Sequence, residues 1–187
     1  MRRMETDMPR RTETDRIMWF SMWFLASIVT FGLAFFPMFY RLIKGRNKHF
    51  LREDELEKRA LTFFKNEVKE LQSNTYRPPK RNAKLWAVSI VLVLPVFVIA
   101  YFLSRDLLLH EKRQRAFLAS LFPEIGYMPQ NIAIKKLALI TVATLGVGII
   151  YWLYKIINMY NNHFREQRKI EDEIIRLMEE KGYGESV

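Results

Sequence analysis

Three long runs of the chain contain no Asp, Glu, Lys, Arg or His, and these runs limit the fold more than any other feature. They cover residues 17–40, 85–104 and 137–154 and are 24, 20 and 18 residues long. A helix needs about 20 apolar residues to cross the hydrocarbon core of a bilayer. The pattern therefore predicts an all-α membrane protein with three transmembrane helices, at about residues 17–43, 85–104 and 135–158.

The segments that follow the apolar runs are rich in charge and have the apolar spacing of amphipathic helices. We expect such helices outside the membrane at about residues 47–72, 105–122 and 160–181. A chain of 187 residues with three spans leaves no room for a separate large domain, so residues 1–187 are predicted to form a single membrane domain. The first run is longer than the apolar part of a cleavable signal, about 7–15 residues, and is expected to be retained.

An internal repeat connects the first and third runs. A shift of 114 residues aligns two sets of seven identical residues, namely Thr30, Gly32, Tyr40, Ile43, Asn47, His49 and Phe50 with Thr144, Gly146, Tyr154, Ile157, Asn161, His163 and Phe164. The middle run is a weaker copy that keeps Tyr101 and, nine residues later, His110. The chain therefore contains two well-matched copies and one degenerate copy of a unit.

The repeated residues carry a resemblance to a known family. Thr144-Leu-Gly146, Tyr151-Trp152-Leu-Tyr154 and Asn161-x-His163-Phe164 resemble a motif of small prokaryotic membrane proteins with the domain of unknown function catalogued as number 4234. The resemblance covers residues 26–60 and 140–175, and the first copy departs from it at Phe36-Pro37-Met38. It implies a transmembrane helix leading into a charged helix, and it implies no activity.

Small residues recur along the first and third runs. Because small residues allow helix backbones to approach closely in lipid, we predict that the first and third spans are parallel and pack through Thr30, Ala34, Thr144 and Gly148. The full set of predicted helix-packing residues is Ala26, Thr30, Gly32, Ala34, Thr144, Gly146 and Gly148.

The tyrosines and histidines of the repeat are predicted to lie where the spans meet water. Nine residues correspond to two and a half helical turns, so each Tyr and the His that follows it point in opposite directions. The residues of this interface motif are Tyr40, Asn47, His49, Tyr101, His110, Tyr154, Asn161 and His163. The tyrosines suit an aromatic belt. Successive spans alternate in direction, which would place His110 on the opposite side from the other two histidines, so no metal site is expected and the histidines are assigned to hydrogen bonds or headgroup contacts.

The helices after the first and third spans should emerge on the same side of the membrane. We predict that Leu56, Phe63, Phe64 and Val68 pack against Ile170, Ile174 and Leu177. The alternative is that each helix lies flat in the headgroup region.

Motifs for catalysis are absent from the sequence. It has no metalloprotease, nucleophile-elbow or phosphate-loop motif and no Cys, so we predict no enzyme, no catalytic residue and no cofactor. The apolar runs also lack ionisable groups for transport. The prediction is an integral membrane structural or interaction module, with a subunit of an oligomeric channel or transporter as the alternative.

Charge and topology complete the prediction of partners and location. A net charge of +10 favours a lipid bilayer with anionic headgroups as partner, and a homo-oligomer or a membrane-protein partner is also possible. No recognition motif for nucleic acid accompanies the charge. Basic residues are densest just after the first run, which predicts a multi-pass protein of the cell membrane with a cytoplasmic C-terminus.

Overall fold

The computed structural model describes residues 14–64 and 77–184, and this part of the chain is helical. In chain order the elements are α3 (Phe20–Val29), α4 (Phe35–Phe63), α5 (Ala83–Ser89), the short 3₁₀ helix η1 (Ile90–Leu92), α6 (Leu94–Leu121), α7 (Ile134–Ala143) and α8 (Gly148–Gly184). The predicted all-α class is therefore confirmed for these residues.

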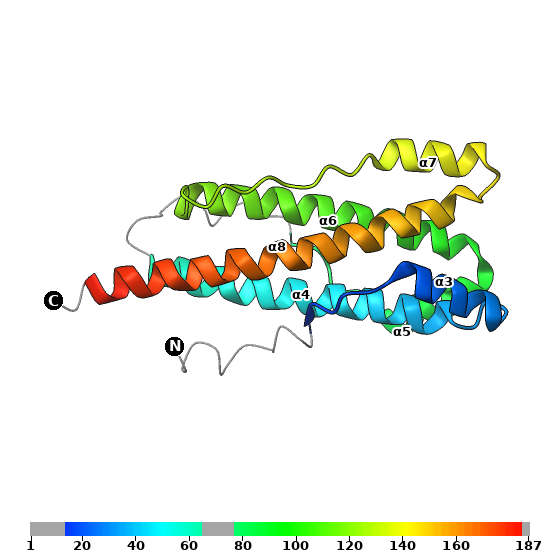
Figure 1. Cartoon of the computed structure of the whole chain (residues 1–187), viewed down its shortest axis with the longest axis horizontal. Helices are drawn as coiled ribbons and strands as arrows, with labels where there is room; N and C mark the ends of the chain where they lie inside the picture. Colours follow the sequence, from blue (N-terminus) through cyan, green and yellow to red (C-terminus); the bar gives the residue numbers. More distant parts are fainter. Residues whose placement is uncertain (1–13, 65–76, 185–187) are drawn as a thin grey trace.

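Each apolar run folds back on itself as a helical hairpin with a short first arm and a long second arm. The short arms are α3, α5 with η1, and α7, and the long arms are α4, α6 and α8. All three long arms start at the same end of the molecule and run in the same direction, side by side, while the turns gather at that end (Figure 1). The core of the protein is thus a parallel three-helix bundle made of three repeats.

Glycine makes the reversal possible in the first and third hairpins. Gly32 and Gly146 have φ angles of 91° and 96°, which side chains disfavour. The amide of Gly32 donates to the carbonyl of Ser27 at 2.6 Å, and the amide of Gly146 donates to the carbonyl of Thr141 at 2.8 Å. These bonds close the last turn of the short arm and prevent the helix from continuing.

Threonine starts the long arm of the same two hairpins. The hydroxyl oxygen of Thr30 accepts from the amide of Ala34 at 3.0 Å, and that of Thr144 accepts from the amide of Gly148 at 2.7 Å. An oxygen at this position satisfies an amide that the helix itself leaves unpaired. The repeated Thr-x-Gly motif is therefore a helix-reversal signal.

The middle hairpin turns with different residues. Val93 has φ 60° and ψ −53°. Pro95 lies in the first turn of α6, where its lack of an amide hydrogen removes no helical hydrogen bond. In all three copies the turn exposes apolar side chains at the end of the bundle, most completely Phe31 and Leu145 with 98% and 96% of their surface accessible.

The predicted transmembrane architecture is wrong. In the described residues, no helix combines the length and the apolar character that a membrane crossing requires. The run at 17–43 is interrupted after Val29, the run at 85–104 is interrupted at 90–93, and the run at 135–158 is interrupted after Ala143. The length of each apolar run alone predicted a continuous helix. The turn-forming residues inside each run divide it into two helical arms instead.

Several further predictions depended on spanning helices and are also wrong. They are the integral membrane module, its alternative as a channel or transporter subunit, the lipid bilayer and anionic headgroups as partner, and the multi-pass location with a cytoplasmic C-terminus. The prediction of a homo-oligomer or a membrane-protein partner also rested on the spanning helices and is not supported. The aromatic belt has no spans to flank, and Tyr101 and Tyr154 lie about half exposed on the outside of the bundle.

The small residues of the predicted packing stripe do not lie on one continuous helix. Ala26, Thr30 and Ala34 would share one face only on a continuous helix, but α3 ends at Val29. Thr30 and Thr144 are exposed, and their hydroxyls donate to carbonyls of their own short arms. Gly148 is a close-packing residue, although its contact is with Thr141 of the same hairpin.

Equivalent residues of the three repeats form successive layers along the bundle axis. The layers lie 11 and 7 residues before each His and 7 and 11 residues after it, the spacing of a coiled-coil-like seam. They are Met38, Ile99 and Trp152; then Leu42, Leu103 and Ile156; then Leu56, Phe117 and Ile170; then Ala60, Leu121 and Ile174, all of which are buried.

The predicted pairing of α4 with α8 is confirmed in part. Leu56, Phe64, Ile170 and Ile174 belong to one buried cluster, with Leu177 packed against it. Phe63 is 41% exposed, and Val68 lies outside the described residues. The prediction missed α6, whose Phe117 and Leu118 complete the same cluster, because alternating spans would have placed that helix elsewhere.

Candidate metal centre

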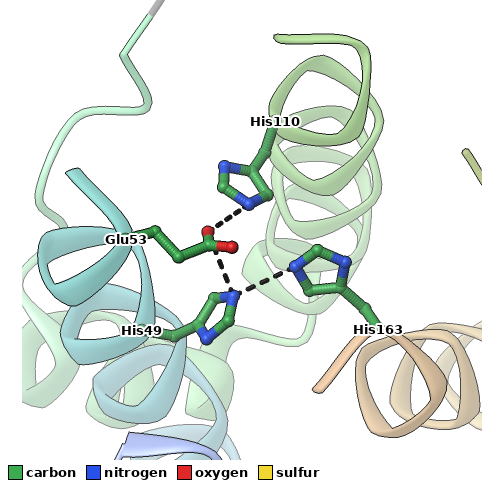
Figure 2. A group of neighbouring side chains, drawn as sticks. All are labelled: His49, Glu53, His110 and His163. Atoms are coloured by element: carbon green, nitrogen blue, oxygen red, sulfur yellow. Dashed lines mark hydrogen bonds and ion pairs between the residues drawn. The ribbon is translucent and has the colours of Figure 1, made fainter. Parts of the chain in front are cut away.

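Three histidines and one glutamate meet on the axis of the bundle. His49 and Glu53 come from α4, His110 comes from α6 and His163 comes from α8, and their side chains point toward a common centre (Figure 2). Each residue offers one ligand atom, and these atoms all lie within 4.8 Å of one another. The cluster exists because the three long arms are parallel, so that the histidines of all three repeats reach the same level.

The nitrogen and oxygen atoms of this cluster lie at the spacing of metal ligands. Nε2 of His49 lies 3.0 Å from Nε2 of His163 and 3.2 Å from Oε2 of Glu53. Nε2 of His110 is also in close contact with Oε2 of Glu53. In a tetrahedral zinc site with bonds of about 2.0–2.1 Å, neighbouring ligand atoms are about 3.3 Å apart. The two contacts of His49 lie close to that spacing, and all four ligand atoms lie within 4.8 Å of one another.

Hydrogen bonds do not account for all of these contacts. Glu53 Oε2 and His110 Nε2 are buried and have no partner in hydrogen-bonding geometry. These atoms point at one shared position instead of forming hydrogen bonds with one another. A central metal ion requires this arrangement of its ligand atoms.

One carboxylate orients the ring of His49 from outside, and a second carboxylate lies near the ring of His163. Asp15 Oδ1 lies 2.8 Å from Nδ1 of His49, and Glu111 Oε1 lies 3.3 Å from Nδ1 of His163. A proton on Nδ1 that faces a carboxylate leaves the lone pair of Nε2 free to bind a metal. Carboxylate–histidine–metal chains of this kind are common around protein metal ions.

The centre is closed to solvent and carries excess negative charge. His49 and His163 are 0% exposed, His110 is 1% exposed and Glu53 is 4% exposed. Arg52 balances the neighbouring carboxylates by pairing with Asp15 at 2.8 Å and with Glu171 at 2.7 Å. Within the described ranges, no Lys or Arg pairs with Glu53 or Glu111. A divalent cation among neutral imidazoles would balance these two charges.

In the metal-free protein, a proton on His49 supplies positive charge in place of the metal ion. Burial lowers the pKa of His49, but Glu53 and Asp15 outweigh burial and raise this pKa to about 9. Burial raises the pKa of Glu53, but His110 and His49 hold it well below its usual range. Burial keeps the pKa of His163 low despite its contact with Glu111. His49 is thus the imidazole whose proton competes with a metal ion.

The next layer of the bundle contains a second polar ring. Glu53, Gln114 and Gln167 each follow a repeat histidine by four residues, and Gln114 Nε2 contacts Gln167 Oε1 and lies 3.4 Å from Glu53 Oε1. The same three side chains line a small cavity of about 10 Å³. A space of about 10–15 Å³ holds one water molecule.

The repeated asparagines have a separate and structural role. Asn161 accepts from the amide of Met18 at 2.9 Å and donates to its carbonyl at 2.7 Å. Asn47 makes the same pair of bonds with Arg81, at 3.2 Å and 2.7 Å. In both cases the asparagine of one repeat holds the extended segment that enters another hairpin. Met18 lies in the strap of residues 14–19, which also carries Asp15 to His49.

Sequence reasoning placed some of these residues correctly and rejected the centre itself. Tyr and His do point in opposite directions, since Tyr154 is 45% exposed and His163 is buried. The conclusion that His110 must lie away from His49 and His163 is wrong, because every hairpin returns its long arm in the same direction. Sequence reasoning also missed Asp15, Glu53 and Glu111. For Glu53 there was a visible signal, because a Glu or Gln lies four residues after every repeat His.

Comparisons with known proteins supply no further guide to this centre. No family model, no curated protein and no solved structure matches the chain. The resemblance to the family with domain of unknown function 4234 therefore stays a prediction, and no step below rests on it.

Proposed function

We propose that this protein binds one divalent transition-metal ion, with zinc as the best fit, through His49, Glu53, His110 and His163. The observation that carries the proposal is the convergence of three Nε2 atoms and one carboxylate oxygen at metal-ligand spacing. Three nitrogen ligands and one oxygen ligand suit zinc, which accepts this mixture in tetrahedral geometry.

The ion would act as a structural link between the three repeats. Its four ligands come from α4, α6 and α8, so that one bound ion holds all three long arms in register. Four protein ligands fill a tetrahedral site and leave no open position, as in structural zinc sites. We accordingly expect no catalysis at a four-coordinate centre, in agreement with the absence of catalytic motifs.

A five-coordinate centre with a bound water is the second candidate. Its basis is the small cavity of about 10 Å³ beside Glu53, which is lined also by Gln114 and Gln167. A metal-bound water has a much lower pKa than free water and can take part in chemistry, although the burial of this site restricts access for a substrate. The visible absorption of the cobalt-substituted protein separates the two candidates, since four-coordinate cobalt absorbs much more strongly than five-coordinate cobalt.

The decisive experiment is a metal titration of purified protein previously stripped with a chelator. We expect one zinc ion per chain after desalting, measured by elemental mass spectrometry, and sub-micromolar affinity by competition with a chromophoric chelator. Glu53→Gln should lose most of this affinity. Glu57→Gln is the matched control, because Glu57 lies one turn further along the same helix and pairs with Arg113. Failure to retain zinc, nickel, cobalt, manganese or iron would overturn the proposal, and so would equal affinities of the two variants.

A further inference from the structure

A second site lies on the side of the bundle, where α3 and the strap of residues 14–19 cover the first half of α4. Here the structure has a cavity of about 690 Å³. Ligand sites of drug-like molecules are typically about 300–1,000 Å³. None of the four candidate metal ligands lines this cavity, so the inference does not depend on the proposed metal centre.

The side of the cavity formed by α4 is basic. Arg41, Lys44 and Lys48 lie at successive turns on one face of α4 and line its wall. Across the described residues, none of the three forms an ion pair with a carboxylate, and no Asp or Glu lines the cavity. The field inside the cavity is therefore positive, and low-polarity walls strengthen its attraction for an anion.

The side of the cavity formed by α3 is apolar and aromatic. Met22, Trp23 and Ala26 of α3 line it toward the hairpin turn, opposite Tyr40 of α4. The Arg41 guanidinium lies 5.4 Å from the centre of the Trp23 ring, and Lys44 Nζ donates to the hydroxyl of Tyr40 at 3.0 Å. The first of these contacts joins the aromatic side of the cavity on α3 to the basic side on α4, and the second places Lys44 beside Tyr40 on α4.

From this arrangement we infer that the cavity binds a single amphipathic anion, namely one carboxylate or phosphate group attached to an alkyl chain. The acidic group would lie among Lys44, Lys48 and Arg41, and the chain would lie along Trp23, Met22 and Ala26. A purely apolar ligand would leave the cations without a partner, and a small inorganic anion would leave the aromatic wall in contact with water. Only a molecule with both parts satisfies both sides of the cavity.

Dodecanoate below its micelle concentration is a suitable probe, because Trp19 and Trp23 both line the cavity and report on it by fluorescence. We expect saturable binding of dodecanoate with one molecule per chain, and at least tenfold weaker binding of dodecanol and of inorganic phosphate. Trp19→Phe together with Trp23→Phe should remove most of the fluorescence change, which assigns the signal to the cavity and not to Trp86 or Trp152. Equal binding of dodecanol, or no saturable binding of dodecanoate, would overturn the inference.

A charge-matched pair of double variants distinguishes the site from general attraction to a basic protein. Lys44→Gln with Lys48→Gln should weaken dodecanoate binding at least tenfold by calorimetry. Lys135→Gln with Lys136→Gln removes the same charge from exposed positions on α7 and should change binding less than twofold. Equal weakening by both pairs would mean that net charge alone attracts the anion, and the inference would then be wrong.

Discussion

Asp15 Oδ1 accepts a hydrogen bond from Nδ1 of His49 across 2.8 Å, although the two residues are 34 positions apart. Both side chains are completely buried. The bond fixes the tautomer of His49, directs its Nε2 to the axis of the bundle and attaches the strap of residues 14–19 to the candidate metal centre. Asn161 holds Met18 and so secures the same strap further along the chain.

Removing the charge of Asp15 should weaken metal binding without removing a ligand. Loss of a carboxylate that orients a ligating histidine typically costs about 10–100-fold in metal affinity. We expect Asp15→Asn to show a loss in this range by chelator competition. Asp54→Asn is the matched control, because Asp54 is a neighbouring carboxylate of α4 that pairs with Lys58, Arg77 and Arg113 and not with a histidine. Unchanged affinity in Asp15→Asn would show that the bond to His49 has no part in binding.

Metal binding should release at least one proton at neutral pH. The pKa of His49 is raised to about 9 in the metal-free protein, so this imidazole is protonated at pH 7 and must lose its proton to become a ligand. Calorimetric titration in buffers of different ionisation enthalpy measures the number of protons released. Affinity should rise with pH up to about 9. A binding enthalpy that does not depend on the buffer would contradict the assignment.

The metal-free protein should lose stability as pH rises. The folded-state pKa of His49 is above the unfolded value of about 6.5. Its protonated form therefore stabilises the fold below the unfolded pKa, and this contribution is lost as pH rises through about 9. Bound metal replaces the proton. We therefore expect chelation to lower the melting temperature more at pH 9 than at pH 6, as measured by circular dichroism. At free metal about 100-fold above Kd, the ion should add about 2.7 kcal/mol to the free energy of unfolding.

Gly148 should tolerate no side chain. A Cβ at this position would lie 2.8 Å from Cα of Thr141, which is backbone and cannot move aside. We expect Gly148→Ala to lower the free energy of unfolding by about 1–3 kcal/mol in urea titrations. Gly126→Ala is the control, because a Cβ there meets nothing within 4 Å. Similar stability of the two variants would show that α7 and α8 are less closely packed than the structure indicates.

Asn161 and Asn162 are adjacent, but only the first should affect stability. Asn161→Ala removes two hydrogen bonds to the backbone of Met18 and should cost about 1–3 kcal/mol. Asn162 is exposed, and within the described part of the chain its side chain hydrogen-bonds to Arg165 at 3.3 Å, so Asn162→Ala should change stability by less than about 0.5 kcal/mol. Amide exchange at Met18 supplies a local measurement. It should accelerate in Asn161→Ala alone, and equal exchange in both variants would contradict the strap role of Asn161.

The sequence determined the local features of this protein. The repeat, the helical class and the opposite directions of Tyr154 and His163 follow from residue spacing, because 3.6 residues per turn fix which side chains share a face. The apolar spacing of Leu56 and Ile170 likewise predicted that α4 and α8 pack together.

Only the tertiary structure decided the direction of the long arms, and with it the site. Thr30 and Gly32 are compatible both with a close-packed apolar helix and with a helix reversal, since a hydroxyl can bond within either backbone. The reversal makes α4, α6 and α8 parallel, and parallel arms bring His110 level with His49 and His163 on one axis. Residue spacing measures distance along one helix, whereas the metal centre depends on how three helices are placed side by side.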